Sequence, residues 1–144
     1  MFPTPTGPLP IPDSFLDNDD LLEAQGELWE ALTDGDAASV RAAIAKGADI
    51  HIGNPEDPLT PLILAANEGM ADIVAILVQA GANVNSYFIQ DTEDFGPVLV
   101  CPLGQADAME HTEVLAFLRE NGAMELQALA AWIVEHEGVE VHYG

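Results

Sequence analysis

Residues 59–85 constrain the fold more than any other part of the chain, because they carry start and stop signals for two short helices in close succession. Thr60 can cap the first helix with its hydroxyl group, and Pro61 suits the first helical position, where no backbone N–H is needed. Gly69 can end this helix in the left-handed conformation that glycine tolerates. The sequence therefore predicts a short helix that begins at Pro61 and ends before Gly69.

A second helix is predicted over residues 71–80, and Gly81 ends it. Its apolar residues have the spacing that places them on one wide face: Ile73, Val74, Ile76, Leu77 and Val78. The first helix has a buried side of the same kind: Leu62, Leu64, Ala65 and Ala66. Neither helix can bury its apolar side alone, so we expect neighbouring units packed on both sides of this pair.

Several residues of this segment recur in a known order and spacing: Thr60-Pro61-Leu62, Leu64-Ala65-Ala66, Gly69, Ile73-Val74, Leu77 and Gly81-Ala82-Asn83-Val84-Asn85. In this pattern the segment resembles an ankyrin repeat, a helix–turn–helix unit with a period of about 33 residues. One position departs from the pattern, since Ile63 stands where the family usually has a histidine that ties neighbouring turns together. The resemblance implies a stack of such repeats.

Weaker copies of the pattern flank the segment. Residues 47–51 match the end of a repeat, and 34 residues separate Gly47 from Gly81, close to the family's period. From Gly81 to the next matching glycine, Gly122, the interval is 41 residues. Residues 86–100 therefore hold about eight residues more than the usual period, and we expect a long inserted loop there.

The third repeat begins with Cys101-Pro102-Leu103 in place of Thr-Pro-Leu, and residues 124–136 read as a further helix that closes the stack. Residues 139–143 alternate like a short strand, or form a packed tail. We therefore expect an all-α fold: an ankyrin-type helix–turn–helix repeat solenoid with a long inserted loop and a C-terminal capping helix. The expected boundaries are a proline-rich N-terminal arm at 1–18 and a single domain at 19–144, with repeats at roughly 19–52, 53–86 and 97–124 and a cap at 125–144.

Charge is the second informative feature of the chain. Its 25 acidic residues stand against three Lys and Arg residues, for a formal net charge of −22. Such a charge largely excludes direct binding to nucleic-acid phosphates. It has three competing explanations: general solubility, adaptation to a high-salt cytoplasm, or complementarity to a strongly basic partner.

The sequence offers no recognisable catalytic or metal site. The four histidines, at positions 51, 111, 136 and 142, have no ligand spacing, and a His-carboxylate cluster at 135–137 is more typical of a solvated helix end. Cys101 has no basic neighbour to lower its pKa, so it predicts a buried small residue and not a nucleophile. We expect no enzyme activity and no cofactor.

Location is inferred from what the sequence contains. With Cys101 as its one cysteine, the chain forms no internal disulfide, which fits a reducing compartment. No apolar run approaches the length of a membrane span, and the first twelve residues carry five prolines and no Lys or Arg, unlike a secretory signal. We expect a cytoplasmic protein that is a monomer when free.

The resemblance implies binding to proteins through the loop tips and the concave face of the first helices. In this chain those surfaces are residues 52–58, residues 86–95 and the first-helix ends at 33–34, 67–68 and 108–109. The candidate partner-binding residues are Asp34, Glu56, Asp57, Glu68, Tyr87, Phe88, Asp91, Glu93, Asp94 and Phe95. Aromatic residues beside acids suit a basic protein surface. The alternative is that Phe88, Ile89 and Phe95 pin the long loop onto the stack.

The leading hypothesis is a non-enzymatic protein that binds and neutralises a basic protein partner. Its most concrete form is an immunity or inhibitor protein against a nuclease-type toxin, whose own phosphate-binding site must be positive. Two alternatives stay open: a DNA mimic that inhibits DNA-binding proteins, and a general ankyrin scaffold from a high-salt organism.

Overall fold

The computed structural model describes residues 4–7, 17–51 and 59–143. The described chain forms seven helices and a two-stranded sheet. In chain order the elements are α2 (Asp19–Asp34), α3 (Ala37–Ala45), α4 (Pro61–Glu68), α5 (Ala71–Gln79), β1 (Phe88–Thr92), β2 (Gly96–Val100), α6 (Pro102–Ala108), α7 (Thr112–Glu120) and α8 (Leu126–Glu137).

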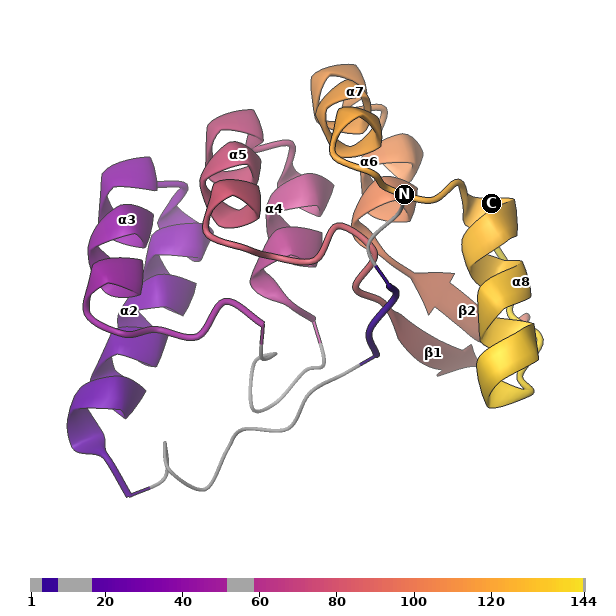
Figure 1. The fold of residues 1–144 in the computed structure, drawn as a ribbon, viewed down its shortest axis with the longest axis horizontal. Coiled ribbons are helices and arrows are strands. Elements are labelled where there is room, and N and C mark those ends of the chain that lie inside the picture. Colours follow the sequence, from indigo (N-terminus) through magenta and orange to yellow (C-terminus); the bar gives the residue numbers. More distant parts are fainter. Residues whose placement is uncertain (1–3, 8–16, 52–58, 144) are drawn as a thin grey trace.

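Three helix pairs lie side by side, and together they form the repeat stack (Figure 1). The first helices α2, α4 and α6 make one row, and the second helices α3, α5 and α7 make the other. One continuous apolar core runs through all three pairs, and its largest fully buried side chains include Leu28, Leu62, Leu77 and Leu118. Burial between neighbouring pairs is what stabilises helices this short.

Local capping explains where the helices begin and end. The Thr60 hydroxyl accepts a hydrogen bond from the Ile63 backbone N–H at 3.3 Å, and Pro61 occupies the first turn of α4. Gly69 closes α4 with φ 71°, as the sequence predicts. At the start of α6 the Cys101 sulfur takes the place of threonine, 3.4 Å from the Gly104 N–H.

The expected all-α fold with a long inserted loop needs correction, because residues 88–100 of the insertion form an antiparallel β-hairpin. Phe88 pairs with Val100 and Ile89 with Leu99. The side chains of Phe88 and Val100 pack on Ile63, whereas Ile89 and Leu99 pack on the opposite face with residues of α8. Both faces of the hairpin are partly buried, so its sequence lacks the alternation of apolar and polar residues that identifies a half-exposed strand.

Ile63, the departure from the family pattern, contacts this hairpin. Its side chain has no exposed surface and forms a small apolar cluster with Phe88 and Val100. A histidine there would place a polar ring against two apolar side chains, at a cost unless it found a hydrogen-bond partner. Isoleucine at position 63 is therefore suited to the apolar face of the inserted hairpin.

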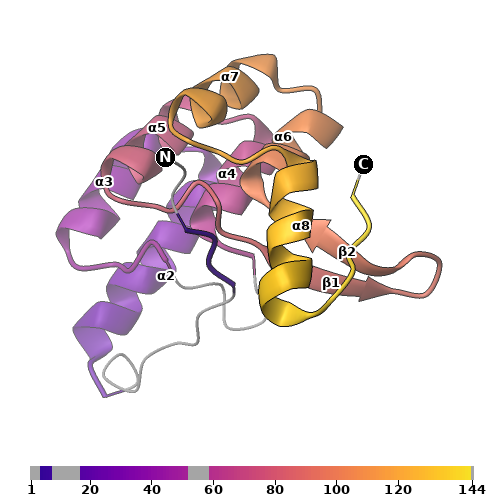
Figure 2. The ribbon, with the colours of Figure 1, turned by 45° about the vertical axis from the view of Figure 1, so that its right-hand side comes forward.

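Helix α8 lies against the hairpin (Figure 2). Leu129, Ala130 and Ile133 form a second buried cluster with Tyr87, Leu99 and Cys101. The Tyr87 hydroxyl donates a hydrogen bond to Glu137 Oε2 at 2.6 Å, and its ring meets Trp132 edge to face at 6.3 Å. These contacts tie α8 to the hairpin, and its role as an end cap of the stack stays a prediction.

Both ends of the described chain add short pairings to this region. Tyr87 N–H donates to the Thr6 carbonyl at 3.0 Å, and the Asn83 side chain donates to the Thr4 carbonyl at 2.6 Å. At the other end, residues 139–143 form a tail with a single parallel bridge from His142 to Val98. The arm at 4–7 and this tail therefore both contact the segment around the hairpin.

None of the helices in the described ranges is both long and apolar enough to cross a membrane.

Candidate functional site

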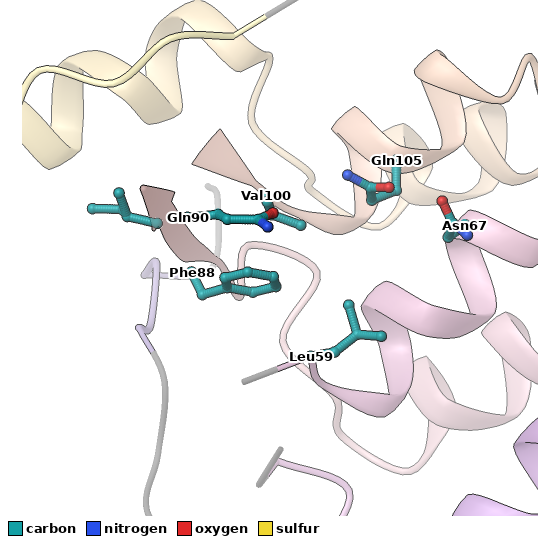
Figure 3. Close-up of a pocket in the computed structure, with 7 residues that line it drawn as sticks. Leu59, Asn67, Phe88, Gln90, Val100 and Gln105 are labelled. Atoms are coloured by element: carbon teal, nitrogen blue, oxygen red, sulfur yellow. The ribbon is translucent and has the colours of Figure 1, made fainter. Parts of the chain in front are cut away.

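A pocket of about 420 Å³ opens between the β-hairpin and the first helices α4 and α6 (Figure 3). We call it the hairpin groove, and its lining residues are Leu59, Asn67, Phe88, Ile89, Gln90, Val100 and Gln105. The groove exists because the inserted hairpin stands beside the ends of two first helices. A regular three-repeat stack without the insertion would lack the side of the groove that the hairpin forms.

The lining of the groove combines apolar and amide groups. Leu59 and Phe88 lie near each other at one side, and Asn67 and Gln105 approach each other from α4 and α6 at the other (Figure 3). Side-chain amides both donate and accept hydrogen bonds, as peptide groups do. An apolar wall with a few convergent amides is typical of a binding pocket for a polypeptide or small ligand.

Each of the three first helices carries an exposed carboxylate in its last turn. Asp34 ends α2, Glu68 ends α4 and Asp107 lies one residue before the end of α6. None of these last turns contains a basic residue. The C-terminal end of a helix carries partial negative charge, so a carboxylate there is destabilising by roughly 0.3–1 kcal/mol at low ionic strength.

Two of the three cations are paired with other acids, and of these three carboxylates Asp107 also contributes to raising the pKa of Arg119. Lys46 pairs with Glu27 at 2.9 Å and Arg119 with Glu125 at 2.8 Å, both at exposed positions. In each pair the carboxylate raises the pKa of the cation. The remaining cation, Arg41, is exposed on α3. The acids at the ends of α2 and α4 therefore face solvent with little local compensation.

The hairpin separates the predicted loop residues into exposed and buried groups. Asp91, Glu93, Asp94 and Phe95 are exposed towards its turn, and the Phe95 side chain is 65% exposed. The Phe95 ring stacks on His142 with centroids 5.1 Å apart. This group gives the hairpin an acidic tip, and the turn between β1 and β2 projects away from α8 (Figure 2).

Two of the predicted contact residues are buried in the free protein. Tyr87 and Phe88 are only 3% and 7% exposed, because Tyr87 packs on α8 and Phe88 on Ile63. The alternative interpretation, in which Phe88, Ile89 and Phe95 pin the loop to the stack, fits Phe88 and the half-buried Ile89 but not the exposed Phe95. Phe88 also lines the hairpin groove, where a ligand could reach it.

The other predicted residues are distributed over the stack. Asp34 and Glu68 lie at the ends of different first helices, and Glu68 lies beside the groove residue Asn67. Glu56 and Asp57 lie outside the described residues. Gln90 and Gln105 were not predicted, because an isolated glutamine has no sequence signal of its own and only the hairpin brings these two together.

Cys101 is buried, and His111 contacts the neighbouring repeat. Burial raises the pKa of the Cys101 thiol to about 11, and its side chain is only 2% exposed. The prediction of a buried small residue is confirmed. His111 lies with Nε2 3.0 Å from the Asn67 carbonyl, joining the second and third repeats. In the described ranges no three His, Cys, Asp or Glu side chains are grouped so that they could hold a metal ion.

Comparison with known proteins agrees with this architecture. A family model for ankyrin repeats, in three copies, matches residues 28–128. None of the curated proteins compared with the chain matches it. The match covers most of the chain and all three helix pairs except the start of α2. The chain belongs to the ankyrin-repeat family.

Proposed function

We propose that this ankyrin-repeat protein binds and neutralises a basic protein partner through its acidic surface. Ankyrin repeats form a protein-interaction module and are generally non-enzymatic scaffolds, which supports the first part of the proposal. The most concrete partner is a nuclease-type toxin, which would make this protein its immunity or inhibitor protein. A nuclease must present positive charge to its phosphate substrate, and an acidic stack would cover that charge.

One observation carries the proposal: each of the three first helices has an exposed carboxylate in its last turn. Asp34, Glu68 and Asp107 lie where the helix dipole is unfavourable to negative charge. General solubility would be served equally well by acids at helix N-termini, where they also stabilise. A basic partner docked against these ends would relieve the unfavourable interaction, so part of the electrostatic cost in the free protein becomes binding free energy.

Steering supports the same proposal. With a net charge of −22, the free protein attracts basic surfaces over distances set by the Debye length. Electrostatic steering raises association rates towards 10⁸–10⁹ M⁻¹s⁻¹ at low salt. Fast association is useful to an inhibitor that must bind a toxin before the toxin binds its own substrate.

The test is association kinetics against ionic strength. The probes are purified basic nuclease domains, starting with any small basic protein encoded beside this gene, and unrelated basic proteins of matched charge. We expect a tight complex with one nuclease, with an association rate that falls at least tenfold between 50 and 500 mM salt. A rate that does not change with salt contradicts the proposal.

The same panel distinguishes the two rival functions. A DNA mimic would bind several unrelated DNA-binding proteins and compete with duplex DNA for each. A scaffold from a high-salt organism would bind none selectively and would fold only in molar salt. Asp34→Asn with Glu68→Gln should slow association with the cognate nuclease, while Asp19→Asn with Asp20→Asn at the start of α2 serves as a charge-matched control.

A further inference from the structure

Among the described residues, backbone groups on the outer edge of β1 have no hydrogen-bond partner. On β2, the Leu99 N–H donates to the His142 carbonyl at 2.9 Å, and the Pro97 carbonyl accepts from the His142 N–H at 2.8 Å. The hydrogen-bonding backbone groups of residues 97 and 99 therefore point away from β1. In an antiparallel pair, the residues opposite them, Asp91 and Ile89, must point their N–H and C=O groups away from β2 as well.

Within its described residues 4–7, the N-terminal arm pairs with the position before this edge. Tyr87, the preceding outward-pointing residue, donates its N–H to the Thr6 carbonyl at 3.0 Å. Beyond it, the described residues provide no hydrogen-bond partner for the backbone of Ile89 or Asp91. β2 is already covered on its outer side by the tail, so β1 is the edge at which the sheet can be extended.

The hairpin groove lies beside this edge. Phe88 and Gln90 line the groove on the face of the hairpin that packs on Ile63. A strand added to β1 would lie about 4.8 Å away, and its side chains would alternate between the two faces of the sheet. Alternate side chains of such a strand would therefore point to the groove, where Leu59 and Phe88 offer apolar contacts and Asn67 and Gln105 offer amides.

We propose that the β1 edge binds an extended segment of the basic partner as an added β-strand, with an apolar side chain in the hairpin groove and Lys or Arg side chains beside the acidic tip. This inference rests on the proposed function for the charge of the partner. The carboxylates of Asp91, Glu93 and Asp94 are exposed at one end of the edge and would attract such side chains. β-Strand addition draws affinity from the main chain and specificity from the pockets for alternate side chains.

Charge decides against a second copy of this chain as the occupant. Two copies would each carry a net charge of −22, and their acidic tips would meet at the shared edge. Like charges opposed across an interface cost several kcal/mol. The same carboxylates would attract a basic segment bound at this edge.

The experiment compares two substitutions at position 91 that differ in the outward backbone N–H. Asp91→Ala and Asp91→Pro both remove the carboxylate, but only proline removes the outward N–H. Because that N–H does not pair with β2, proline leaves the hairpin ladder intact, and proline is tolerated at such edge positions. The probe is the capped peptide Lys-Val-Lys-Val-Lys-Val, with Glu-Val-Glu-Val-Glu-Val as the charge control.

We expect the lysine peptide to bind the full-length chain and the glutamate peptide not to bind. Loss of one backbone hydrogen bond of about 1 kcal/mol should make Asp91→Pro bind the lysine peptide about fivefold more weakly than Asp91→Ala does. Amide hydrogen exchange of Ile89 and Asp91 should slow on binding, whereas Phe88 and Gln90, already paired with β2, should change little.

Each result decides one part of the proposal. Equal binding by the two position-91 variants, with unchanged exchange at Ile89 and Asp91, overturns strand addition even if charge attraction persists. Binding of both peptides with equal affinity, combined with the loss in Asp91→Pro, keeps the strand site and refutes the basic partner. If Asp91→Pro does not fold by circular dichroism, lysine peptides N-methylated at alternate residues replace it. Methylation of the set of N–H groups that faces β1 should weaken binding, and the proposal is overturned if blocking neither set weakens it.

Discussion

Replacing Gly69 with alanine tests how the second and third repeats are joined. Gly69 ends α4 with φ 71°, and a Cβ atom built there would lie only 2.5 Å from Nδ1 of His111. The Nε2 atom of the same ring lies 3.0 Å from the Asn67 carbonyl. An alanine at position 69 can therefore be accommodated only if the His111 ring moves and gives up this contact.

Matched glycines separate the backbone cost from the contact. Gly35 and Gly138 have φ 71° and 69°, but a Cβ at Gly35 would meet only Met70 Sδ at 3.5 Å, and at Gly138 it would meet nothing within 4 Å. Left-handed alanine costs about 1–2 kcal/mol, which is the expected loss for Gly35→Ala and Gly138→Ala. Gly69→Ala adds a lost hydrogen bond and lost packing, so we expect about 2–4 kcal/mol.

Urea unfolding followed by circular dichroism gives these free energies of unfolding directly. A double-mutant cycle with His111→Ala isolates the ring contact, since Gly69→Ala should cost no more than Gly35→Ala once the imidazole is gone. The reasoning is refuted if Gly69→Ala and Gly35→Ala destabilise equally in the native background, or if removing the His111 ring leaves the cost of Gly69→Ala unchanged.

Three further predictions concern stability and reactivity. Changing Asp34, Glu68 and Asp107 together to their amides should raise the free energy of unfolding by about 1–3 kcal/mol at low salt, and the gain should shrink in molar salt; a loss of stability would contradict the dipole argument. Iodoacetamide should modify Cys101 far more slowly at pH 8 in the native state than in urea, because the thiol is buried and its pKa is about 11; equal rates would disprove this. Burial first, and then the hydrogen bond to the α8 carboxylate, raise the pKa of Tyr87, so its contribution to stability is complete below pH 10 and is lost as pH rises further, where the unfolded chain ionises first. Tyr87→Phe should remove this alkaline dependence in pH-resolved urea melts, and an unchanged pH profile would count against it.

The repeat stack could be predicted because its signals are local. Thr60, Pro61 and Gly69 act on the backbone within one or two turns of themselves, and α4 begins and ends where they indicate. The register of the neighbouring repeats follows from a fixed period and needs no knowledge of distant contacts. For the same reason the expected helix at 124–136 was found close to its place, as α8.

The hairpin could not be predicted in the same way, because its partners are distant in the chain. Phe88 is buried by Ile63, 25 residues earlier, and Tyr87 by α8, about 45 residues later. Without those partners the same aromatic residues read as exposed anchors in an acidic loop. The groove residues Gln90 and Gln105 likewise acquire a shared environment only when the hairpin stands beside α6.

By itself, the sequence determined the helix–turn–helix unit, its repetition, and a surface dominated by carboxylates, because capping, periodicity and composition are properties of neighbouring residues. Only the tertiary structure decided that residues 88–92 and 96–100 pair as strands, that Tyr87 and Phe88 face inwards, and that the backbone of Ile89 and Asp91 points away from β2. The physical reason is that strand pairing and burial depend on which surfaces meet across the fold, and contacts between distant segments leave no local pattern in the chain.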